Sequence, residues 1–261
     1  MLILLFNSTN KDYSRFHYVL FFFFTTFLSS ALNIQRQALA TCFFFLSVKY
    51  IDRNIYKYYL CVICASFIHY SSAILLPFWF ISNKYLKPLD NQKLAVIAYL
   101  CTFIFATIFG EYINSILPML LSSDKYLNNL DNIDEQMNIS TGLGIIVKHI
   151  LNIIIILFST QMIRFYDNSC WLKNMYRCFL VGALFANVFG SSVFLSRVPF
   201  ALCSLKIFLF AYMTYFLFHS RLNRLSHTLI GAFIIVMCLT MLFFAIAHGD
   251  GGISPYEFKW I

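Results

Sequence analysis

Arg36 is the first residue of this sequence whose chemistry and surroundings both suggest a function. It lies in the polar run Asn33-Ile-Gln-Arg-Gln37, between two strongly apolar segments. An arginine close to hydrocarbon costs a few kcal/mol and usually faces a cavity inside the protein. An arginine that snorkels to the membrane interface would give the same pattern. Because Gln35 and Gln37 flank the arginine, a cavity wall is an equally good interpretation.

A histidine and a second arginine follow further along the chain. His69 stands beside Tyr70 and Ser71, and imidazole is the side chain best suited to exchange a proton near neutral pH. Taken alone, such a histidine is more often a buried group that forms hydrogen bonds with its neighbours and has no catalytic role. Arg197 lies just before Pro199, which suits the first turn of a following helix.

Arginine and histidine together fit one kind of chemistry. Guanidinium groups are the usual partners of phosphate and diphosphate oxygens, so Arg36 and Arg197 could hold a lipid diphosphate while His69 takes a proton. The sequence has no Walker loop, no HExxH or GxSxG motif, and no DxD-type metal pair near these residues. We therefore expect neither a metal ion nor a cofactor in the site.

The composition predicts a membrane protein. Apolar and aromatic residues make up 60% of the 261 positions, charged residues only 11%, and the mean hydropathy is +0.74. A soluble domain carries about a quarter charged residues. The net charge of +8 is explained by basic cytoplasmic loops, and no basic stripe on a soluble module indicates nucleic acid. The eight cysteines form no zinc pattern, and we interpret them as small buried hydrophobes.

Apolar runs of the length needed to cross a bilayer predict the fold. We expect a single all-α domain over residues 1–261: a polytopic transmembrane helix bundle with about seven full spans plus a short-helix hairpin near 58–82. Gly182-x3-Ala186-x3-Gly190 is a stripe of small residues suited to close helix contact. The predicted apolar segments are 17–33, 37–50, 58–82, 94–117, 143–163, 175–195, 199–218 and 228–247.

The hairpin is inferred from charge. Basic residues flank the segment on both sides, at 49–57 and at 84–93. A single crossing would place one basic cluster outside, whereas a reversal near His69 leaves both in the cytoplasm, as the positive-inside rule requires. The acidic loop 118–142 then lies in the periplasm. The tip of such a hairpin needs protein or a wet cavity around it.

The pattern of these residues resembles the EpsG-like branch of the Wzy polysaccharide polymerases of bacterial inner membranes. The resemblance rests on Ile34-Gln-Arg-Gln-Ala-Leu-Ala40 opening a helix, a basic turn at 49–57, and Ile68-His-Tyr-Ser-Ser-Ala73. A later outer-face arginine, Arg197, also fits. The pattern covers roughly residues 25–225.

The resemblance implies a metal-independent, inverting glycosyltransferase in the multi-pass inner membrane of a bacterium. It would join undecaprenyl-diphosphate-linked oligosaccharide repeat units at the outer face, in O-antigen, capsule or exopolysaccharide synthesis. A chain-length regulator protein is a candidate partner, besides membrane lipid. Carried over by position, Arg36 and His69 are the catalytic residues. The substrate-binding residues are then Gln35, Gln37, Tyr70, Ser71 and, as a looser match, Arg197.

Two other functions stay open. A flippase for lipid-linked oligosaccharides would also need arginines near a diphosphate, but it should show internal repeats, and none is visible here. A non-catalytic assembly subunit is the second alternative, because the chain lacks the amino-terminal acidic and tyrosine positions of the family pattern. Residues 1–6 resemble the end of an apolar span, which predicts that the natural product begins upstream of Met1.

Overall fold

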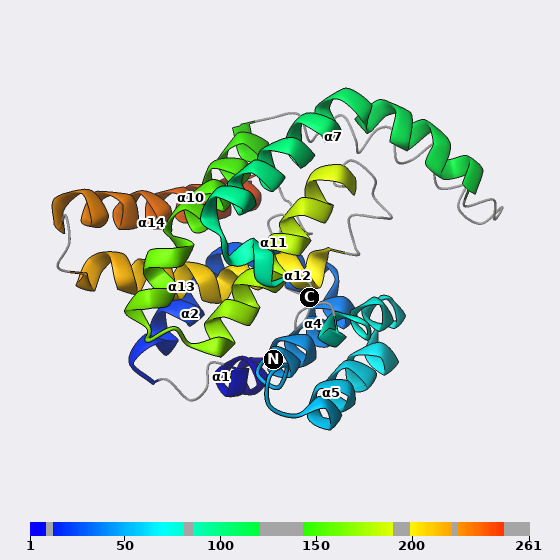
Figure 1. The fold of residues 1–261 in the computed structure, drawn as a ribbon, viewed down its shortest axis with the longest axis horizontal. Coiled ribbons are helices and arrows are strands. Elements are labelled where there is room, and N and C mark those ends of the chain that lie inside the picture. Colours follow the sequence, from blue (N-terminus) through cyan, green and yellow to red (C-terminus); the bar gives the residue numbers. More distant parts are fainter. Residues whose placement is uncertain (9–12, 81–85, 121–142, 190–198, 221–223, 248–261) are drawn as a thin grey trace, which may run out of the picture.

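The chain folds into a bundle of helices. The computed structural model describes residues 1–8, 13–80, 86–120, 143–189, 199–220 and 224–247, and within these ranges it contains helices and turns but no strand (Figure 1). The all-α prediction is confirmed for this part of the chain. In order, the elements are α1 (Leu2–Ser8), α2 (Tyr13–Thr26), α3 (Leu28–Asn33), α4 (Gln35–Val48), α5 (Ile55–Ile68), η1 (Tyr70–Leu75), α6 (Phe78–Phe80), η3 (Lys87–Asp90), α7 (Gln92–Leu120), α10 (Leu143–Phe165), α11 (Cys170–Phe189), α12 (Phe200–Cys203), α13 (Lys206–His219) and α14 (Arg224–Ala247).

Four helical segments of the described part are long and apolar enough to cross a membrane. They are Gln92–Gly110, Gly144–Phe165, Phe200–His219 and Arg224–Ala247. The third forms the centre of the bundle, with 78% of its most apolar window buried, whereas the first and the fourth are only 11% and 17% buried. Apolar helices that are this exposed need lipid around them, because water would not solvate them.

The expected count of about seven full spans is not confirmed, because several apolar segments are broken or short. The segment 17–33 divides at Phe27 into α2 and α3, and the segment 37–50 corresponds to the 14-residue helix α4. The segment 199–218 is one of the four long segments, although it is also interrupted at Ser204, between α12 and α13. At both breaks a hydroxyl bonds the carbonyl four residues earlier: Thr26 bonds Phe22 O at 2.7 Å, and Ser204 bonds the carbonyl of residue 200 at 2.7 Å. Such back-bonding competes with the helical ladder and bends helices.

The segment 58–82 reverses direction, as the charges predict. Helix α5 ends at Ile68, and His69 adopts an extended conformation (φ −147°, ψ 111°) before the 3-10 helix η1 begins. The buried hydroxyl of Tyr58 donates a 2.7 Å hydrogen bond to the carbonyl of Leu75, across the two limbs. The chain therefore turns back at His69 instead of continuing as one tilted helix.

The remaining boundaries shift by a few residues. Residues 118–120 of the predicted loop belong to the end of α7, and 121–142 lie outside the described residues. Helix α11 begins at Cys170, five residues before the predicted segment 175–195. The predicted close contact is present at Gly182, which packs against α12, whereas Gly190 lies outside the described residues.

Aromatic side chains fill the core between α2, α4 and α13. The rings of Phe22 and Phe210 lie 5.5 Å apart, and those of Phe45 and Phe208 lie 5.1 Å apart in an edge-to-face arrangement. Edge-to-face and tilted pairs are the favoured geometries of aromatic contacts. This core holds α4, and with it the residues of the candidate site, against the buried helix α13.

Candidate functional site

Two antiparallel helices form the candidate site. Helices α4 and α5 each have 14 residues and pack against each other, joined by the turn 49–54. Asn54 caps α5 by accepting a 3.0 Å hydrogen bond from the backbone N–H of Lys57. Because the helices are equally long and antiparallel, the start of α4 lies beside the end of α5.

A cavity of about 680 Å³ opens at this junction. Cavities that hold small molecules commonly measure about 300–1,000 Å³. Its wall comes from the end of α3, the first turn of α4 and the end of α5 with the residues that follow it. The lining residues are Leu32, Ile34, Gln35, Arg36, Gln37, Ser66, Phe67, Ile68, His69 and Tyr70.

The α4 side of the cavity favours an anion. The side chain of Arg36 is exposed, while Gln37 is buried with 6% of its surface exposed. Ile34, at the N-cap position, provides no side-chain acceptor for the helix. The first-turn N–H groups of a helix have no intrahelical acceptors, and the helix dipole adds positive potential there. Arg36 thus adds a full positive charge where the backbone already attracts negative groups.

The α5 side has the opposite polarity. The last carbonyl groups of a helix carry partial negative charge and accept hydrogen bonds. The hydroxyl of Ser66 donates to the carbonyl of Val62 at 2.8 Å, so its proton is already engaged. His69 is the first residue after α5, and its backbone N–H donates a 2.9 Å hydrogen bond to the carbonyl of Ala65. The centroid of its ring lies 5.3 Å from that of Tyr70. This side suits groups that donate hydrogen bonds, such as sugar hydroxyls.

The structure brings together five of the seven predicted site residues. Arg36 and His69, 33 positions apart in the sequence, line the same cavity, as do Gln35, Gln37 and Tyr70. Ser71 is half-buried and is not part of the cavity wall. Arg197 lies outside the described residues.

The described chain resumes at Pro199, two residues after Arg197, and there it contacts the segment that precedes α3. Pro199 is the N-cap of α12, and the ring of Phe200 stacks on that of Phe27 at 5.8 Å. Phe27 immediately precedes α3, whose Leu32 is part of the cavity wall.

Sequence reasoning did not assign the apolar residues of the cavity wall to the site. Leu32, Ile34, Phe67 and Ile68 line it beside the polar residues, and Ser66 was not singled out either. Their position in the sequence could have identified them, because each of these residues stands within four positions of Arg36 or His69. An apolar wall lowers the local dielectric and strengthens the interactions of the charged group beside it.

The arrangement supports electrostatic and acid–base chemistry. Arg36 with the start of α4 can stabilise negative charge, and the imidazole of His69 can accept or donate a proton. Among the residues that the structure describes, no group of three or more His, Cys, Asp or Glu side chains could hold a metal ion.

Comparison with known proteins identifies one family for this chain. No curated protein and no solved structure shows significant similarity to the chain. The model of the EpsG family, in contrast, matches residues 1–258, nearly the whole sequence. A match of this extent includes all elements of the candidate site. The chain therefore belongs to the EpsG family and is a membrane protein of polysaccharide biosynthesis.

Proposed function

We propose that this protein polymerises undecaprenyl-diphosphate-linked oligosaccharide repeat units at the outer face of the bacterial inner membrane, which it crosses several times. The observation that carries the proposal is the cavity shared by Arg36 and His69. One wall attracts a diphosphate and the other accepts hydroxyl protons. Family membership supports the same class of product.

The reaction is a direct displacement at the anomeric carbon. A hydroxyl of the acceptor sugar attacks this carbon, and His69 takes the hydroxyl proton as general base. The bond from the anomeric carbon to the diphosphate oxygen breaks as the new glycosidic bond forms. The lipid diphosphate leaves with the bonding electron pair, and its growing charge is stabilised by Arg36 and the first turn of α4. Attack from the face opposite to the leaving group inverts the anomeric configuration.

The short length of α4 and α5 determines how deep the cavity lies in the membrane. Fourteen residues of α helix span about 21 Å, whereas the hydrocarbon core of a bilayer is about 30 Å thick. A cavity at the far end of α4 and α5 is therefore recessed below the outer membrane surface. The diphosphate of a lipid-linked donor, whose tail stays in the bilayer, would meet it there.

The first test is substitution of Arg36. A hydrogen-bonded contact to a charged group contributes up to about 3 kcal/mol, so Arg36→Ala should lower the polymerisation rate roughly a hundredfold. Arg36→Lys should rescue poorly, because an ammonium group cannot reproduce the bidentate fork of a guanidinium. Arg53→Ala is the matched control, since Arg53 is an exposed arginine in the turn at the opposite end of α4.

The readout is surface polysaccharide together with the amount of each variant in the membrane. Normal long-chain polysaccharide in a strain with well-expressed Arg36→Ala would refute the assignment. Deletion of the gene separates the alternatives: loss of a polymerase leaves single repeat units at the surface, whereas loss of a flippase leaves none. A deletion with no effect on either would indicate an assembly role.

A further inference from the structure

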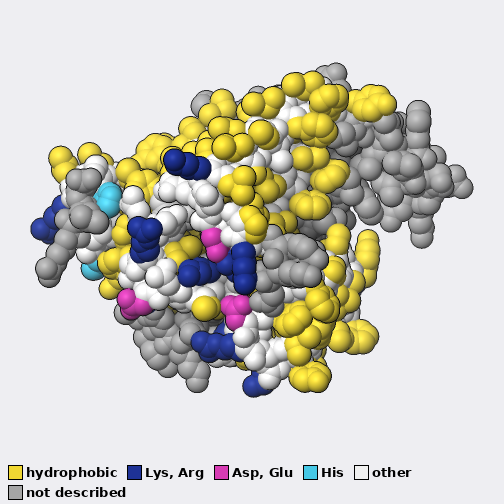
Figure 2. Space-filling view, in the orientation of Figure 1, with side chains coloured by type: hydrophobic (Ala, Val, Ile, Leu, Met, Phe, Trp, Pro, Cys, Tyr) yellow, Lys and Arg dark blue, Asp and Glu magenta, His cyan; other side chains and the backbone are white. Residues whose placement is uncertain are grey.

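A second set of polar residues lies away from the cavity, where α11 meets the chain segments on either side of the hairpin. Asn174 and Arg177 stand three positions apart on α11, hence on the same helical face. They are almost fully buried, with 2% and 9% of their surface exposed. Figure 2 shows basic and acidic side chains gathered in the middle of one face of the molecule, with hydrophobic side chains on either side of them.

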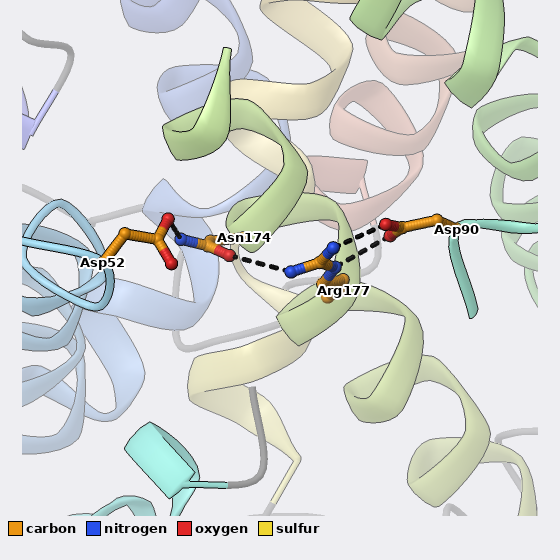
Figure 3. Close-up of polar contacts among 4 residues, drawn as sticks. All are labelled: Asp52, Asp90, Asn174 and Arg177. Atoms are coloured by element: carbon orange, nitrogen blue, oxygen red, sulfur yellow. Dashed lines mark hydrogen bonds and ion pairs between the residues drawn. The ribbon is translucent and has the colours of Figure 1, made fainter. Parts of the chain in front are cut away.

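Arg177 makes a bidentate ion pair with Asp90 (Figure 3). Its Nε donates to one carboxylate oxygen at 2.7 Å and its Nη2 donates to the other at 2.5 Å. Its Nη1 donates to the side-chain oxygen of Asn174 at 3.4 Å. The amide nitrogen of Asn174 in turn donates to Asp52. Arg177 and Asn174 thus hold two carboxylates from different parts of the chain in one continuous network.

The two carboxylates bracket the hairpin. Asp52 lies in the turn just before α5, and Asp90 ends η3, the helix that follows the hairpin. Both ends of the hairpin are therefore attached to a single turn of α11. The pair with Asp90 is only partly sheltered from solvent, because the side chain of Arg177 is 10% exposed and that of Asp90 is 38% exposed.

The hairpin connects the network around Arg177 to the cavity. The hydrogen bond from Tyr58 to Leu75 joins its two limbs. We therefore expect a displacement at the base of the hairpin to move His69 and Tyr70 at its tip. The tip lies about 20 Å from the base, given the length of α5.

We propose that Arg177 and Asn174 are positioning residues, which clamp both ends of the hairpin to α11 and thereby set the place of His69 relative to Arg36. Neither residue is part of the cavity wall. Displacing a catalytic group by about 1 Å can slow a reaction a hundredfold. The clamp therefore governs catalysis without taking part in binding, a consequence that rests on the proposed polymerase function.

A distance measurement tests the clamp without relying on activity. Spin labels at Leu32→Cys and Phe67→Cys, both exposed at 47% and 87%, report the separation across the cavity by pulsed electron paramagnetic resonance in lipid nanodiscs. The full chain is used, and the four cysteines that are not buried are first replaced by serine: Cys64, Cys101, Cys170 and Cys203. Arg177→Ala should shift or broaden the distance distribution, and Arg177→Lys should do so less. Lys173→Ala is the control, since it removes a positive charge from the first turn of α11 without touching the network.

The kinetic signature distinguishes positioning from binding. Arg177→Ala should lower turnover about tenfold or more and change the half-saturating donor concentration less than about twofold. Asp90→Asn is a milder variant in case Arg177→Ala does not fold. A distance distribution in Arg177→Ala that matches Lys173→Ala would overturn the proposal. A shifted distribution in a protein whose parent shows no polymerisation would uphold the clamp and refute the proposed function instead.

Discussion

Replacing Gly182 by alanine should destabilise the bundle, although alanine is the better helix former. A Cβ atom at this position would lie 2.5 Å from the Cβ of Leu202 and 2.9 Å from the backbone nitrogen of Cys203. Carbon atoms in ordinary contact are about 3.5–4.0 Å apart. The obstructing atoms belong to the backbone and the root of a side chain, so α12 as a whole has to move by about 1 Å.

Two opposing effects decide the magnitude. Glycine to alanine inside a helix gains about 1 kcal/mol of helix propensity, whereas overpacking of this kind costs about 1–3 kcal/mol. Gly110 offers a matched control, because it lies inside α7 and a Cβ there would meet nothing within 4 Å. The propensity gain is common to both variants, so their stabilities should differ by the cost of the clash, about 1–3 kcal/mol.

Thermal unfolding of purified protein in detergent measures this difference. For a chain of this size, 1 kcal/mol corresponds to roughly 2–4 °C in Tm. Gly110→Ala should therefore melt several degrees above Gly182→Ala. If Gly182→Ala melts at the same temperature or higher, the close packing of α11 against α12 is not as the structure has it.

Three further experiments probe the hairpin and the cavity. Tyr58→Phe removes the hydrogen bond across the hairpin and leaves a buried carbonyl without its donor, so thermal unfolding should show a loss of about 1–3 kcal/mol. Tyr56→Phe, two positions before Tyr58 in α5 and with 84% of its side chain exposed, should change nothing measurable. Single cysteines at the exposed Arg53 and Lys87 should react with an impermeant thiol reagent from the cytoplasmic side, and labelling from opposite sides would rule out the hairpin topology. His69→Ala should slow polymerisation while donor binding stays close to normal, and an equal loss of both would argue against a general base.

The sequence is informative about this protein wherever a property depends on composition or on neighbours along the chain. An excess of apolar residues with few charges requires lipid as solvent and helices as the spanning structure. Basic residues on both sides of 58–82 predict a reversal, and the structure has one at His69. The meeting of Arg36 and His69 also follows from local facts, because two helices of equal length joined by a short turn bring their far ends together.

The helix breaks inside apolar segments could not be predicted from the sequence. The helix breaks near Phe27 and at Ser204 fall where no proline or glycine stands. They coincide with hydroxyl groups that bond their own helix, and threonine and serine make such bonds in many unbroken helices as well. Their presence alone therefore does not tell a full span from two short helices.

Only the tertiary structure decided which distant residues share a contact. Asp52, Asp90, Asn174 and Arg177 form one network, yet along the chain they belong to a loop, a short 3-10 helix and an apolar helix. The sequence shows that Asn174 and Arg177 stand three positions apart in an apolar helix, but it does not show which residues they bind. Partners depend on the rotation of each helix about its axis and on its depth against its neighbours. These are set by the packing of many side chains at once, because each contact contributes little and only their sum selects one arrangement.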